Sequence, residues 1–442
     1  MAIELKRKIG ERQAVIGVIG LGYVGLPLIL AFAEKGFEVL GFDIDAAKVQ
    51  RIGAGECYIK HLDEKRLKTV VGKGLLEATT DFSRLSEADA VLICVPTPLT
   101  AQREPEMLYV RASTEQIAQT LRSGQLVILE STTYPGTTDE LVRLLLEDAG
   151  SRGSDLKCGE HFFLAFSPER EDPGNVDFGT TNTPKVVGGV DEVSGDLAEA
   201  LYGEIIDRTV RVSSARAAEA AKLTENIFRA VNIALVNELK IVYEQMGIDI
   251  WEVLDAAATK PFGFMRFNPG PGWGGHCIPL DPFYLAWKAR EYAASTKFIE
   301  LAGEVNVEMP RYVMDKLTLA LNGVGKSVKG SKILVLGLAY KKDIDDPRES
   351  PSFEIINLLL ALGAEVSYHD PHIPVAPAMR TWPDLPPLVS APLDPVGLEA
   401  ADAVLIITDH SVVDYPMVLK HANLIVDTRG VYRGTNAKVV KA

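Results

Sequence analysis

The clearest sign of the fold in this sequence is Gly20-Leu-Gly-Tyr-Val-Gly25, which directly follows an apolar run at residues 14–19. This G-x-G-x-x-G pattern lies between a predicted strand and a predicted helix. Its first two glycines permit a tight turn and a close approach to a pyrophosphate, and the third lets helix and strand pack closely. The helix N-terminus favours negative charge. A plain strand–helix turn does not need all of these features, so the pattern predicts a dinucleotide-binding α/β domain.

An acidic residue at the end of the next predicted strand, residues 37–42, indicates which dinucleotide binds. Asp43 lies 18 residues after Gly25. A carboxylate at this place accepts a hydrogen bond from a ribose 2′-hydroxyl and repels a 2′-phosphate. The sequence therefore predicts NAD, rather than NADP, as the cofactor.

Short apolar runs recur after this turn, at residues 90–95, 126–129 and 162–166. Helix-length segments separate them, which indicates a parallel sheet with both faces covered. After a glycine-rich linker the alternation restarts, and Ser350-Pro351 begins a helix with a capping serine followed by a proline. The strands predicted in this second set are 332–336, 365–369, 403–407 and 424–427.

Residues 213–247 have a different character. Ser213 and Ser214 offer a helix N-cap, the following residues are apolar almost all round, and Gly247 closes the segment. A helix that is apolar on every side is buried, between domains or at a subunit interface. We expect an α/β protein in which two Rossmann-like doubly wound domains are joined by a central helical domain with this long buried helix. The expected domains are 1–212, 213–322 and 323–442.

The composition limits the possible functions. The net charge of −14 argues against binding to nucleic acid or to an acidic membrane surface, since both need a basic face. The N-terminus lacks the apolar core of a signal peptide, and no apolar run approaches the roughly 18 residues needed to cross a bilayer. The four cysteines make no C-x-x-C pair and have no zinc-like spacing with histidine. We expect a soluble cytoplasmic protein without a metal site.

One cysteine, Cys277, lies in the glycine-rich stretch Gly270-Pro-Gly-Trp-Gly-Gly-His-Cys-Ile-Pro-Leu-Asp281. Most lone cysteines are small core residues, and Cys94 in a predicted strand fits that description. The glycines around Cys277 instead let the backbone approach a ligand and give no core packing, and a nearby cation or helix terminus would make the thiol reactive. The loop alone leaves a nucleophile and a packing residue as alternatives. Cys57 and Cys158 receive no role.

Lys222 and Asn226 are four positions apart on the predicted central helix, so they share one face. Each needs a partner if it is buried, because an unpaired charge or amide is costly there. They belong either to a structural hydrogen-bond network or to the wall of a polar pocket. In the second case Lys222 would supply positive charge where an oxyanion develops.

Polar residues also follow the predicted strands, at the sheet edge where open α/β folds bind ligands. In the first α/β segment these are Thr132, Thr133 and the stretch Ser167-Pro-Glu-Arg-Glu171. The second segment has several charged residues after its strands. They belong either to a solvated loop or to a site for a second anion, such as a nucleotide diphosphate. They are Lys341, Asp345, Asp346, Arg348, Asp427 and Arg429.

Together these motifs resemble the UDP-glucose/GDP-mannose dehydrogenase family over residues 14–434. The resemblance rests on ordered segments: GLGYVG at 20–25, VPTP at 95–98, STTYPGTT at 131–138, SPERxDPG at 167–174, KLTEN at 222–226, GGHCIPLDP at 274–282 and GLAYKKDIDDPRESP at 337–351. The family has an NAD domain, a central dimerising helical domain and a C-terminal UDP-binding domain. The resemblance therefore implies an NAD-dependent UDP-sugar 6-dehydrogenase that forms a homodimer or a higher even oligomer.

The family's chemistry implies roles for residues of this chain. A C6 alcohol is oxidised to an aldehyde, Cys277 traps it as a thiohemiacetal, and a second hydride transfer gives a thioester that water releases as the acid. By matching position, Lys222 and Asn226 would stabilise the developing oxyanion. Three residues would position water or assist acid–base steps: Asp281, Thr132 and Glu169.

The resemblance also implies two sets of binding residues. Expected contacts of NAD are Gly20, Gly22, Tyr23, Val24, Gly25, Asp43, Lys48, Thr97, Thr132 and Arg348. Expected contacts of the UDP-sugar are Glu169, Arg170, Lys222, Asn226, Lys260, Arg266, Gly274, Lys341 and Arg429. Lys260 falls near the position where the UDP-glucose branch has an arginine that reaches across the dimer, and Arg266 is a second candidate for that contact.

The sequence departs from the UDP-glucose branch in two places. SPERED stands where that branch has NPEFLRE, and CIPLDP stands where it has C-F-x-K-D. The GPGxGGHCIPxDP form resembles the branch that acts on UDP-N-acetylglucosamine or its manno epimer, and ATKPFGF with SPERxDPG favours the gluco form. UDP-N-acetylglucosamine is the expected substrate, and UDP-N-acetylmannosamine and UDP-glucose are the alternatives.

Two other functions fit part of the pattern. A single-step β-hydroxyacid dehydrogenase shares a Rossmann domain followed by a long helix, but it needs no cysteine and usually lacks a further α/β domain. A non-catalytic sensor of NAD or sugar nucleotides has no need to retain Cys277, Lys222, Asn226 and Asp281 together. The cysteine and the segment after residue 330 favour the UDP-sugar dehydrogenase over both.

Overall fold

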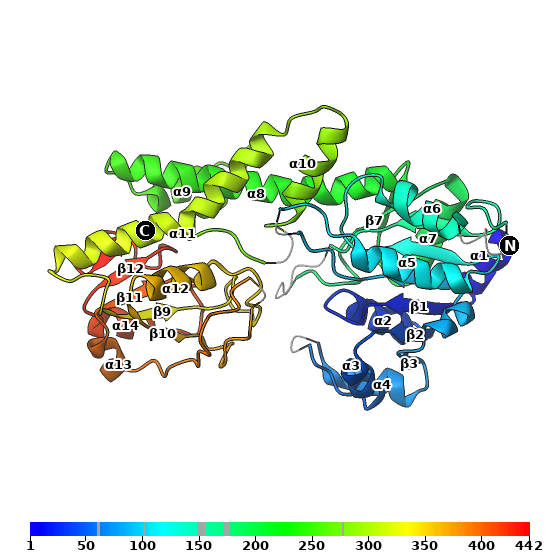
Figure 1. Cartoon of the computed structure of the whole chain (residues 1–442), viewed down its shortest axis with the longest axis horizontal. Helices are drawn as coiled ribbons and strands as arrows, with labels where there is room; N and C mark the ends of the chain where they lie inside the picture. Colours follow the sequence, from blue (N-terminus) through cyan, green and yellow to red (C-terminus); the bar gives the residue numbers. More distant parts are fainter. Residues whose placement is uncertain (60–61, 101, 149–154, 171–176, 276–277, 380) are drawn as a thin grey trace. The chain divides into compact units, whose positions relative to one another are not determined.

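The computed structural model describes residues 1–442 with the exception of 60–61, 101, 149–154, 171–176, 276–277 and 380 (Figure 1). The described residues form two compact units. Unit 1 comprises Met1–Glu225 with Trp287–Ala293, and unit 2 comprises Asn226–Ala286 with Ala294–Ala442. Two helices, α8 (Ala215–Gln245) and α10 (Asp281–Glu291), therefore supply residues to both units.

Unit 1 is built on a mostly parallel sheet with the strand order β3-β2-β1-β4-β5-β6-β7-β8. Among its described strands only the β6–β7 pair is antiparallel. The order reverses between β1 and β4, and open α/β sheets bind ligands at the carboxyl ends of the strands beside such a reversal. The strands are β1 Val15–Ile19, β2 Glu38–Phe42, β3 Leu76–Thr79, β4 Ala90–Ile93, β5 Leu126–Leu129, β6 Phe163–Phe166, β7 Lys185–Gly189 and β8 Thr209–Arg211.

Helices pack on both faces of this sheet. Along β4, Ala90 and Leu92 are buried in a core shared with α2 and α7, whereas Val91 and Ile93 are buried in a core shared with α5. Burial on both faces explains why the central strands are continuous apolar runs. The helices of unit 1 are α1 Ala2–Gly10, α2 Gly25–Glu34, α3 Ala46–Gly53, α4 Glu64–Gly72, η1 Phe82–Glu87, α5 Leu108–Thr120, η2 Thr138–Val142, α6 Arg143–Asp148 and α7 Glu192–Gly203.

Unit 2 combines central helices with a second parallel sheet of order β10-β9-β11-β12-β13. Leu317 of α11 and Phe353 of α12 pack on one face of that sheet, and Leu398 of α13 and Val418 of α14 pack on the other. The further elements are α9 Ile250–Ala257, α11 Lys297–Gly323, β9 Lys332–Leu336, α12 Pro351–Ala361, β10 Glu365–His369, α13 Pro395–Ala400, β11 Ala403–Ile406, α14 Tyr415–His421, β12 Ile425–Asp427 and β13 Val439–Lys441.

This architecture confirms the fold class predicted from the sequence, with two Rossmann-like sheets and a central helical region. The predicted strands all form, with ends that differ by one or two residues. The sequence does not reveal β3, β7, β8 or β13 as strands. Three of them lie at sheet edges and are only partly buried, so they need no apolar run, and β7 begins with a lysine and ends in two glycines.

Helix α8 begins and ends close to where the sequence predicts. The Ser214 hydroxyl accepts a hydrogen bond from the backbone N–H of Ala217 at 3.2 Å, and Gly247 after the helix has a φ of +71°. The isolated chain does not bury α8 on every side, however. Phe228, Leu235 and Val242 are 49%, 51% and 44% exposed.

Unit 1 and unit 2 contain no helix, within the described residues, that has both the length and the apolar character of a membrane span.

Candidate active site

The glycine turn between β1 and α2 has the geometry expected of a dinucleotide turn. Gly20 has a φ of +94°, and a Cβ there would lie 2.4 Å from the carbonyl oxygen of Cys94. A Cβ on Gly25 would lie 1.9 Å from the carbonyl oxygen of Gly20. By contrast, a Cβ on Gly22 would meet no described atom within 4 Å. The turn itself requires the first and last glycines, and Gly22 leaves space for a bound pyrophosphate.

Asp43 follows β2 and is held beside this turn. It is 7% exposed, and its carboxylate accepts hydrogen bonds from the backbone N–H groups of Leu21 at 3.0 Å and Asp45 at 2.9 Å. Nζ of Lys48 lies 3.3 Å from the same carboxylate. The structure thus brings together Asp43, Lys48 and the glycine turn, all of which the sequence predicts to contact NAD.

The other predicted NAD contacts have different surroundings. Thr97 follows β4 and is buried, Thr132 follows β5 and is half-buried, and Tyr23 in the glycine turn is 39% exposed. Arg348 belongs to unit 2, where its guanidinium makes hydrogen bonds of 2.6–3.0 Å to the Asp346 carboxylate. A role of Arg348 in NAD binding stays a prediction.

Lys222 and Glu169, both predicted to be catalytic, meet in unit 1. Lys222 is 5% exposed, and its Nζ donates a hydrogen bond to the backbone carbonyl of Glu169 at 2.6 Å. The same Nζ lies 3.7 Å from the Glu169 carboxylate. The neighbouring Arg170 forms an ion pair with Glu225 at 2.6 Å. These contacts hold the loop after β6 against α8.

The loop after β6 is also tied to the start of β7. Arg170 donates a hydrogen bond to the carbonyl of Pro184 at 2.6 Å, and Nζ of Lys185 donates to the carbonyl of Pro168 at 3.2 Å. The Lys185 ammonium is buried and forms an ion pair with the fully buried Glu130 carboxylate at 2.6 Å. The Glu130 carboxylate and the Pro168 carbonyl together compensate the buried charge of Lys185. Because Lys185 contacts both, it fixes the loop.

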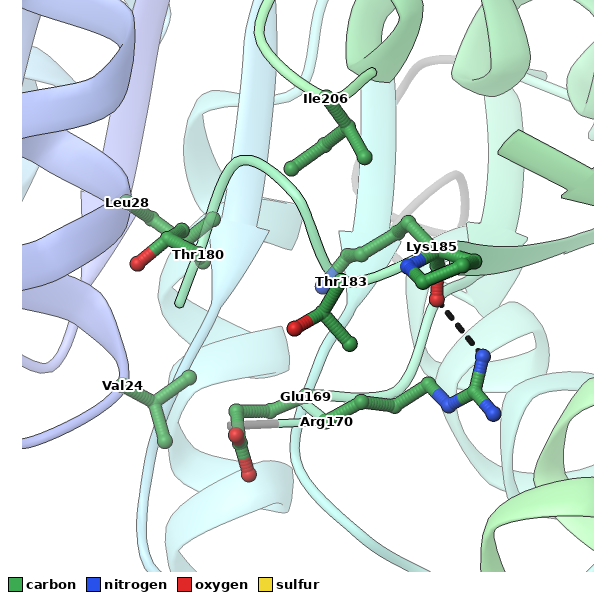
Figure 2. A pocket seen from close by; sticks show the side chains of 9 residues that line it. Val24, Leu28, Glu169, Arg170, Thr180, Thr183, Lys185 and Ile206 are labelled. Atoms are coloured by element: carbon green, nitrogen blue, oxygen red, sulfur yellow. Dashed lines mark hydrogen bonds between the residues drawn. The ribbon is translucent and has the colours of Figure 1, made fainter. Parts of the chain in front are cut away.

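A small pocket opens beside this loop (Figure 2). Val24 of the glycine turn and Glu169 of the loop after β6 both line it, so it connects the predicted cofactor turn with a predicted catalytic loop. Figure 2 also shows the bond from the Arg170 guanidinium to the backbone beside Lys185. The lining residues are Val24, Leu28, Glu169, Arg170, Thr180, Thr183, Pro184, Lys185 and Ile206.

Asn226 and Asp281, the other predicted catalytic pair, meet in unit 2. Nδ2 of Asn226 donates a short hydrogen bond to the carboxylate of Asp281, which is the first residue of α10. Asn226 is 8% exposed and Asp281 is 3% exposed. A carboxylate in the first helical turn interacts favourably with the helix dipole.

The glycine-rich loop before α10 packs closely within unit 2. A Cβ on Gly274 would lie 2.6 Å from Cβ of Tyr340, and a Cβ on Gly270 would lie 2.6 Å from Nη1 of Arg429. The interpretation that these glycines give no packing is therefore wrong, because they let the loop fit against neighbouring side chains. Cys277, near the end of this loop, lies outside the described residues.

The predicted substrate-binding cations of unit 2 also differ in their surroundings. Arg429 is half-buried and donates a hydrogen bond from Nε to the carbonyl of Ile407 at 2.6 Å. Lys341 follows β9 and is half-buried, Lys260 is exposed, and Arg266 is ion-paired with Asp255. Their roles in substrate binding, including any contact across a dimer, stay predictions.

Four buried polar residues support these segments without belonging to a recognisable motif: Glu130, Lys185, Glu219 and Asn237. Asn237 accepts a hydrogen bond from the backbone N–H of Gly270 at 2.9 Å and so holds the glycine-rich loop. Of these four residues, only Glu219 could have been noticed in the sequence, because it lies three positions before Lys222 on the same helix face.

Among the described residues, one cluster in unit 2 has the residue types of a metal site. Ligand atoms of Asp343, His372 and His410 lie within 4.8 Å of one another. However, Nδ1 of His410 accepts a hydrogen bond from the backbone N–H of Asp343 at 3.0 Å, and its Nε2 donates to Asp370 at 3.1 Å. These bonds use both ring nitrogens, so the cluster is a hydrogen-bond network that ties together loops after β9, β10 and β11.

Comparison with protein families gives three matches in order along the chain. The NAD-binding domain of the UDP-glucose/GDP-mannose dehydrogenase family matches residues 14–206, its central domain matches 216–308, and its UDP-binding domain matches 334–434.

Individual proteins are similar over nearly the whole chain. The UDP-N-acetyl-D-mannosamine dehydrogenase of Escherichia coli K12 is 38% identical over 434 residues, covering 95% of this chain and 99% of that protein. The NDP-N-acetyl-D-galactosaminuronic acid dehydrogenase of Ralstonia solanacearum is 36% identical, with coverages of 94% and 96%. The solved UDP-D-ManNAc dehydrogenase of Pyrococcus horikoshii superposes with a TM-score of 0.85 at 32% identity, with coverages of 96% and 98%.

These matches agree with the cofactor expected from Asp43 and with the ligand class expected from the motifs. The protein is an NAD-dependent enzyme of the nucleotide-sugar dehydrogenase type. With all three domain models matched in order from residue 14 to residue 434, this chain belongs to the UDP-glucose/GDP-mannose dehydrogenase family.

Proposed function

We propose that this enzyme oxidises the C6 alcohol of a UDP-N-acetylhexosamine to a carboxylate, with Cys277 as the covalent nucleophile. The observation that carries the proposal is the pairing along α8. Lys222 contacts Glu169, and one helical turn later Asn226 contacts Asp281. Lys222 and Asn226 thus each contact an acidic residue that the family resemblance assigns to the chemistry.

Lys222 is suited to stabilise an oxyanion. It is a buried cation, and its Nζ already lies near a backbone carbonyl and a carboxylate. Because burial lowers the effective dielectric constant, its attraction for negative charge developing on the sugar oxygen is stronger than in water. Glu169 beside it is placed to accept or donate a proton during oxidation or hydrolysis.

Asp281 is suited to orient water. Its bond to Asn226 fixes the direction of the carboxylate, and it lies four residues after Cys277 in the sequence. In this proposal Asp281 directs a water molecule at the thioester carbon. Thr132, in the loop after β5, keeps the role of positioning water that the family resemblance implies.

The residues at the glycine turn fit NAD, since Gly22 leaves its outer side open and the Asp43 carboxylate is fixed beside it. Bound there, NAD would supply the hydride acceptor for the oxidation of C6, one NAD molecule for each of the two oxidations. Between them the Cys277 thiolate adds to the aldehyde carbon, and the second oxidation leaves a thioester. Water then attacks this carbon, the C–S bond breaks, and the carboxylic acid and the free thiol are released.

The names of similar proteins and two segments of the sequence bear on the identity of the sugar. The similar protein from Escherichia coli is a UDP-N-acetyl-D-mannosamine dehydrogenase, and that from Ralstonia solanacearum is an NDP-N-acetyl-D-galactosaminuronic acid dehydrogenase. We therefore propose UDP-N-acetyl-D-mannosamine as the first candidate. UDP-N-acetyl-D-glucosamine is the second, because the sequence at 258–264 and 167–174 favours the gluco form.

A substrate panel tests this proposal. NADH formation is followed by absorbance with NAD and, in turn, the UDP derivatives of N-acetylmannosamine, N-acetylglucosamine, N-acetylgalactosamine and glucose. We expect an N-acetyl sugar to give the highest kcat/KM. If UDP-glucose exceeds every N-acetyl sugar by tenfold, which corresponds to about 1.4 kcal/mol of transition-state binding, the N-acetylhexosamine proposal is wrong.

A further inference from the structure

A third buried polar residue lies on the same face of α8 as Lys222 and Asn226. Glu219 precedes Lys222 by three positions and Asn226 by seven, so the three side chains form one stripe along the helix. Their exposures are 0%, 5% and 8%. Lys222 and Asn226 each hold a predicted catalytic acid, and Glu219 holds a different segment.

The Glu219 carboxylate binds the turn that follows the β5 loop. Oε2 accepts a hydrogen bond from the backbone N–H of Gly136 at 2.6 Å. Oε1 accepts one from the backbone N–H of Thr138 at 2.9 Å and another from its hydroxyl at 2.7 Å. Three donors converge on this carboxylate. Their hydrogen bonds favour its ionised form, whereas its lack of contact with solvent opposes ionisation.

This turn cannot adjust easily if the carboxylate is lost. Gly136 has a φ of +106°, which disfavours any other residue, and a Cβ there would lie 2.9 Å from the side chain of Glu140. The turn leads directly into a π-helical segment at Thr138–Val142, a conformation that is rare and often found at functional sites.

Thr132 lies between this turn and a second anchor. At the other end of the loop, the Ser131 hydroxyl donates a hydrogen bond to the carbonyl of Val95 at 2.7 Å, and its oxygen lies 3.2 Å from the carbonyl oxygen of Ile93. The short stretch from Thr132 to Gly136 is therefore fixed at both ends, by the end of β4 and by Glu219.

We propose that Glu219 is a positioning residue for the dehydrogenase reaction: by holding the turn at 136–138 it sets the place of Thr132. This inference rests on the role that the proposed function gives to Thr132. Glu219 itself touches neither cofactor nor substrate, and it acts through the loop.

If Glu219 positions the turn, the reaction should depend on the protonation state of its carboxylate. Burial raises the pKa of Glu219 to about 7 despite the bonds from Thr138 and Gly136. The charged groups near the turn include Asp139 and Glu140, which directly follow it, and Arg216 on α8, which pairs with both. Lys288 on α10 also binds Glu140, at 2.6 Å. Below its pKa, Glu219 carries a proton that would point at a backbone N–H, so the hold on the turn weakens as pH falls through about 7.

The test compares Glu219→Gln with Asp89→Asn. Asp89 is a matched control, because it is also a buried carboxylate in unit 1 and accepts from the backbone N–H of Val15 and from Lys8 and Arg122. It lies at the amino end of β4, at the sheet edge opposite the loop that carries Thr132. Both substitutions are expected to lower Tm, since each leaves a buried donor without its acceptor.

Only Glu219→Gln should impair the reaction. We expect its kcat to fall by about 100-fold, the effect of a misplaced group, with the KM for the UDP-sugar unchanged. The decline in wild-type kcat below pH 7 should be absent from its pH profile, and Asp89→Asn should keep both the kcat and the decline. If Glu219→Gln lowers Tm but leaves kcat unchanged, the result expected for Asp89→Asn, the proposal is wrong.

A second pair of variants covers the case in which Glu219→Gln does not fold. Thr138→Val removes one donor to Glu219, and Thr138→Ser keeps it. The valine variant should lose kcat and the serine variant should retain it, whereas equal activity would overturn the proposal.

Failure of the proposed function would be recognised separately, by a wild-type enzyme that is inactive on the whole sugar panel. In that case hydrogen exchange at the Gly136 and Thr138 amides, expected to be faster in Glu219→Gln, still tests whether Glu219 holds the turn. Unchanged exchange at both amides would contradict the hold itself.

Discussion

Asp43 is the residue to which we attribute the expected preference for NAD. Both of its oxygens are already aligned by backbone N–H groups of Leu21 and Asp45, and Lys48 balances part of its charge. The carboxylate is therefore oriented before a ligand arrives, and a 2′-phosphate in its place would bring two negative charges together.

Asp43→Ala should therefore weaken the preference for NAD. A hydrogen bond to a charged group contributes about 1.5–3 kcal/mol, so the ratio of kcat/KM values for NAD and NADP should fall by about tenfold or more. Asp45→Ala is the control, since Asp45 is an exposed N-cap of α3 and its loss should affect stability but not this ratio. Equal rates of the wild-type enzyme with NAD and NADP would contradict the role of Asp43.

Among single residues, the sequence identifies those whose side chain is unusual for its surroundings. It does not identify residues whose partners are backbone groups. Lys222 and Asn226 stand out because a lysine and an asparagine on an apolar helix need partners. Glu219 has as its partners the backbone amides of Gly136 and Thr138, more than 80 positions earlier. Backbone amides have no signature in sequence, so only the folded chain reveals that contact.

Helix α8 combines two kinds of surface along its length. One face carries the buried polar stripe of Glu219, Lys222 and Asn226. Phe228, Leu235 and Val242 are spaced seven residues apart, which places them on a common face of a helix, and each is about half exposed in the isolated chain. An exposed apolar stripe of this kind favours a role as an interaction surface.

We predict that this stripe contacts a second copy of the chain. Leu235→Glu places a charge at its centre and should convert a dimer into a monomer, as measured by light scattering after size exclusion at micromolar concentration. Val412→Glu is the control, because Val412 is 69% exposed in the loop before α14 and does not belong to α8. A wild-type protein that is monomeric under these conditions would contradict the prediction.

The strands predicted best from the sequence are those that must be apolar because both of their faces are buried. The central strands β1, β4 and β5 are buried on both faces, so they must be apolar throughout and are easily identified. Edge strands such as β8 and β13 are only partly buried and lack this requirement. The glycines before α10 are equally visible in the sequence, but their packing against Tyr340 and Arg429 depends on which segments the fold brings together.

Considered as a whole, the molecule divides its predicted catalytic residues between its two units. Unit 1 holds the glycine turn, Thr132, and the Lys222–Glu169 pair, and unit 2 holds the Asn226–Asp281 pair. The helices α8 and α10 each supply residues to both units. This division is consistent with a reaction in which the cofactor and the nucleotide sugar are bound by different domains of the family.

The central claim of this account is covalent catalysis by Cys277. If Cys277 is the nucleophile, the wild-type enzyme should release two NADH per UDP-sugar without accumulating free aldehyde. Cys277→Ser replaces a thiol of pKa about 8.5 with an alcohol that is hardly ionised at neutral pH, so it should bind both ligands and turn over orders of magnitude more slowly. Cys94→Ala is the control, because Cys94 is a core residue whose truncation should lower stability without stopping the chemistry.

The most direct measurement is therefore the number of NADH molecules released per sugar by Cys277→Ala, recorded by absorbance with limiting UDP-sugar and excess NAD. We predict that this variant binds NAD normally, because the glycine turn at Gly20 to Gly25 is intact, but fails to complete the second oxidation and the hydrolysis. Release of two NADH per sugar by Cys277→Ala at a rate near that of the wild type would show that Cys277 is only a packing residue.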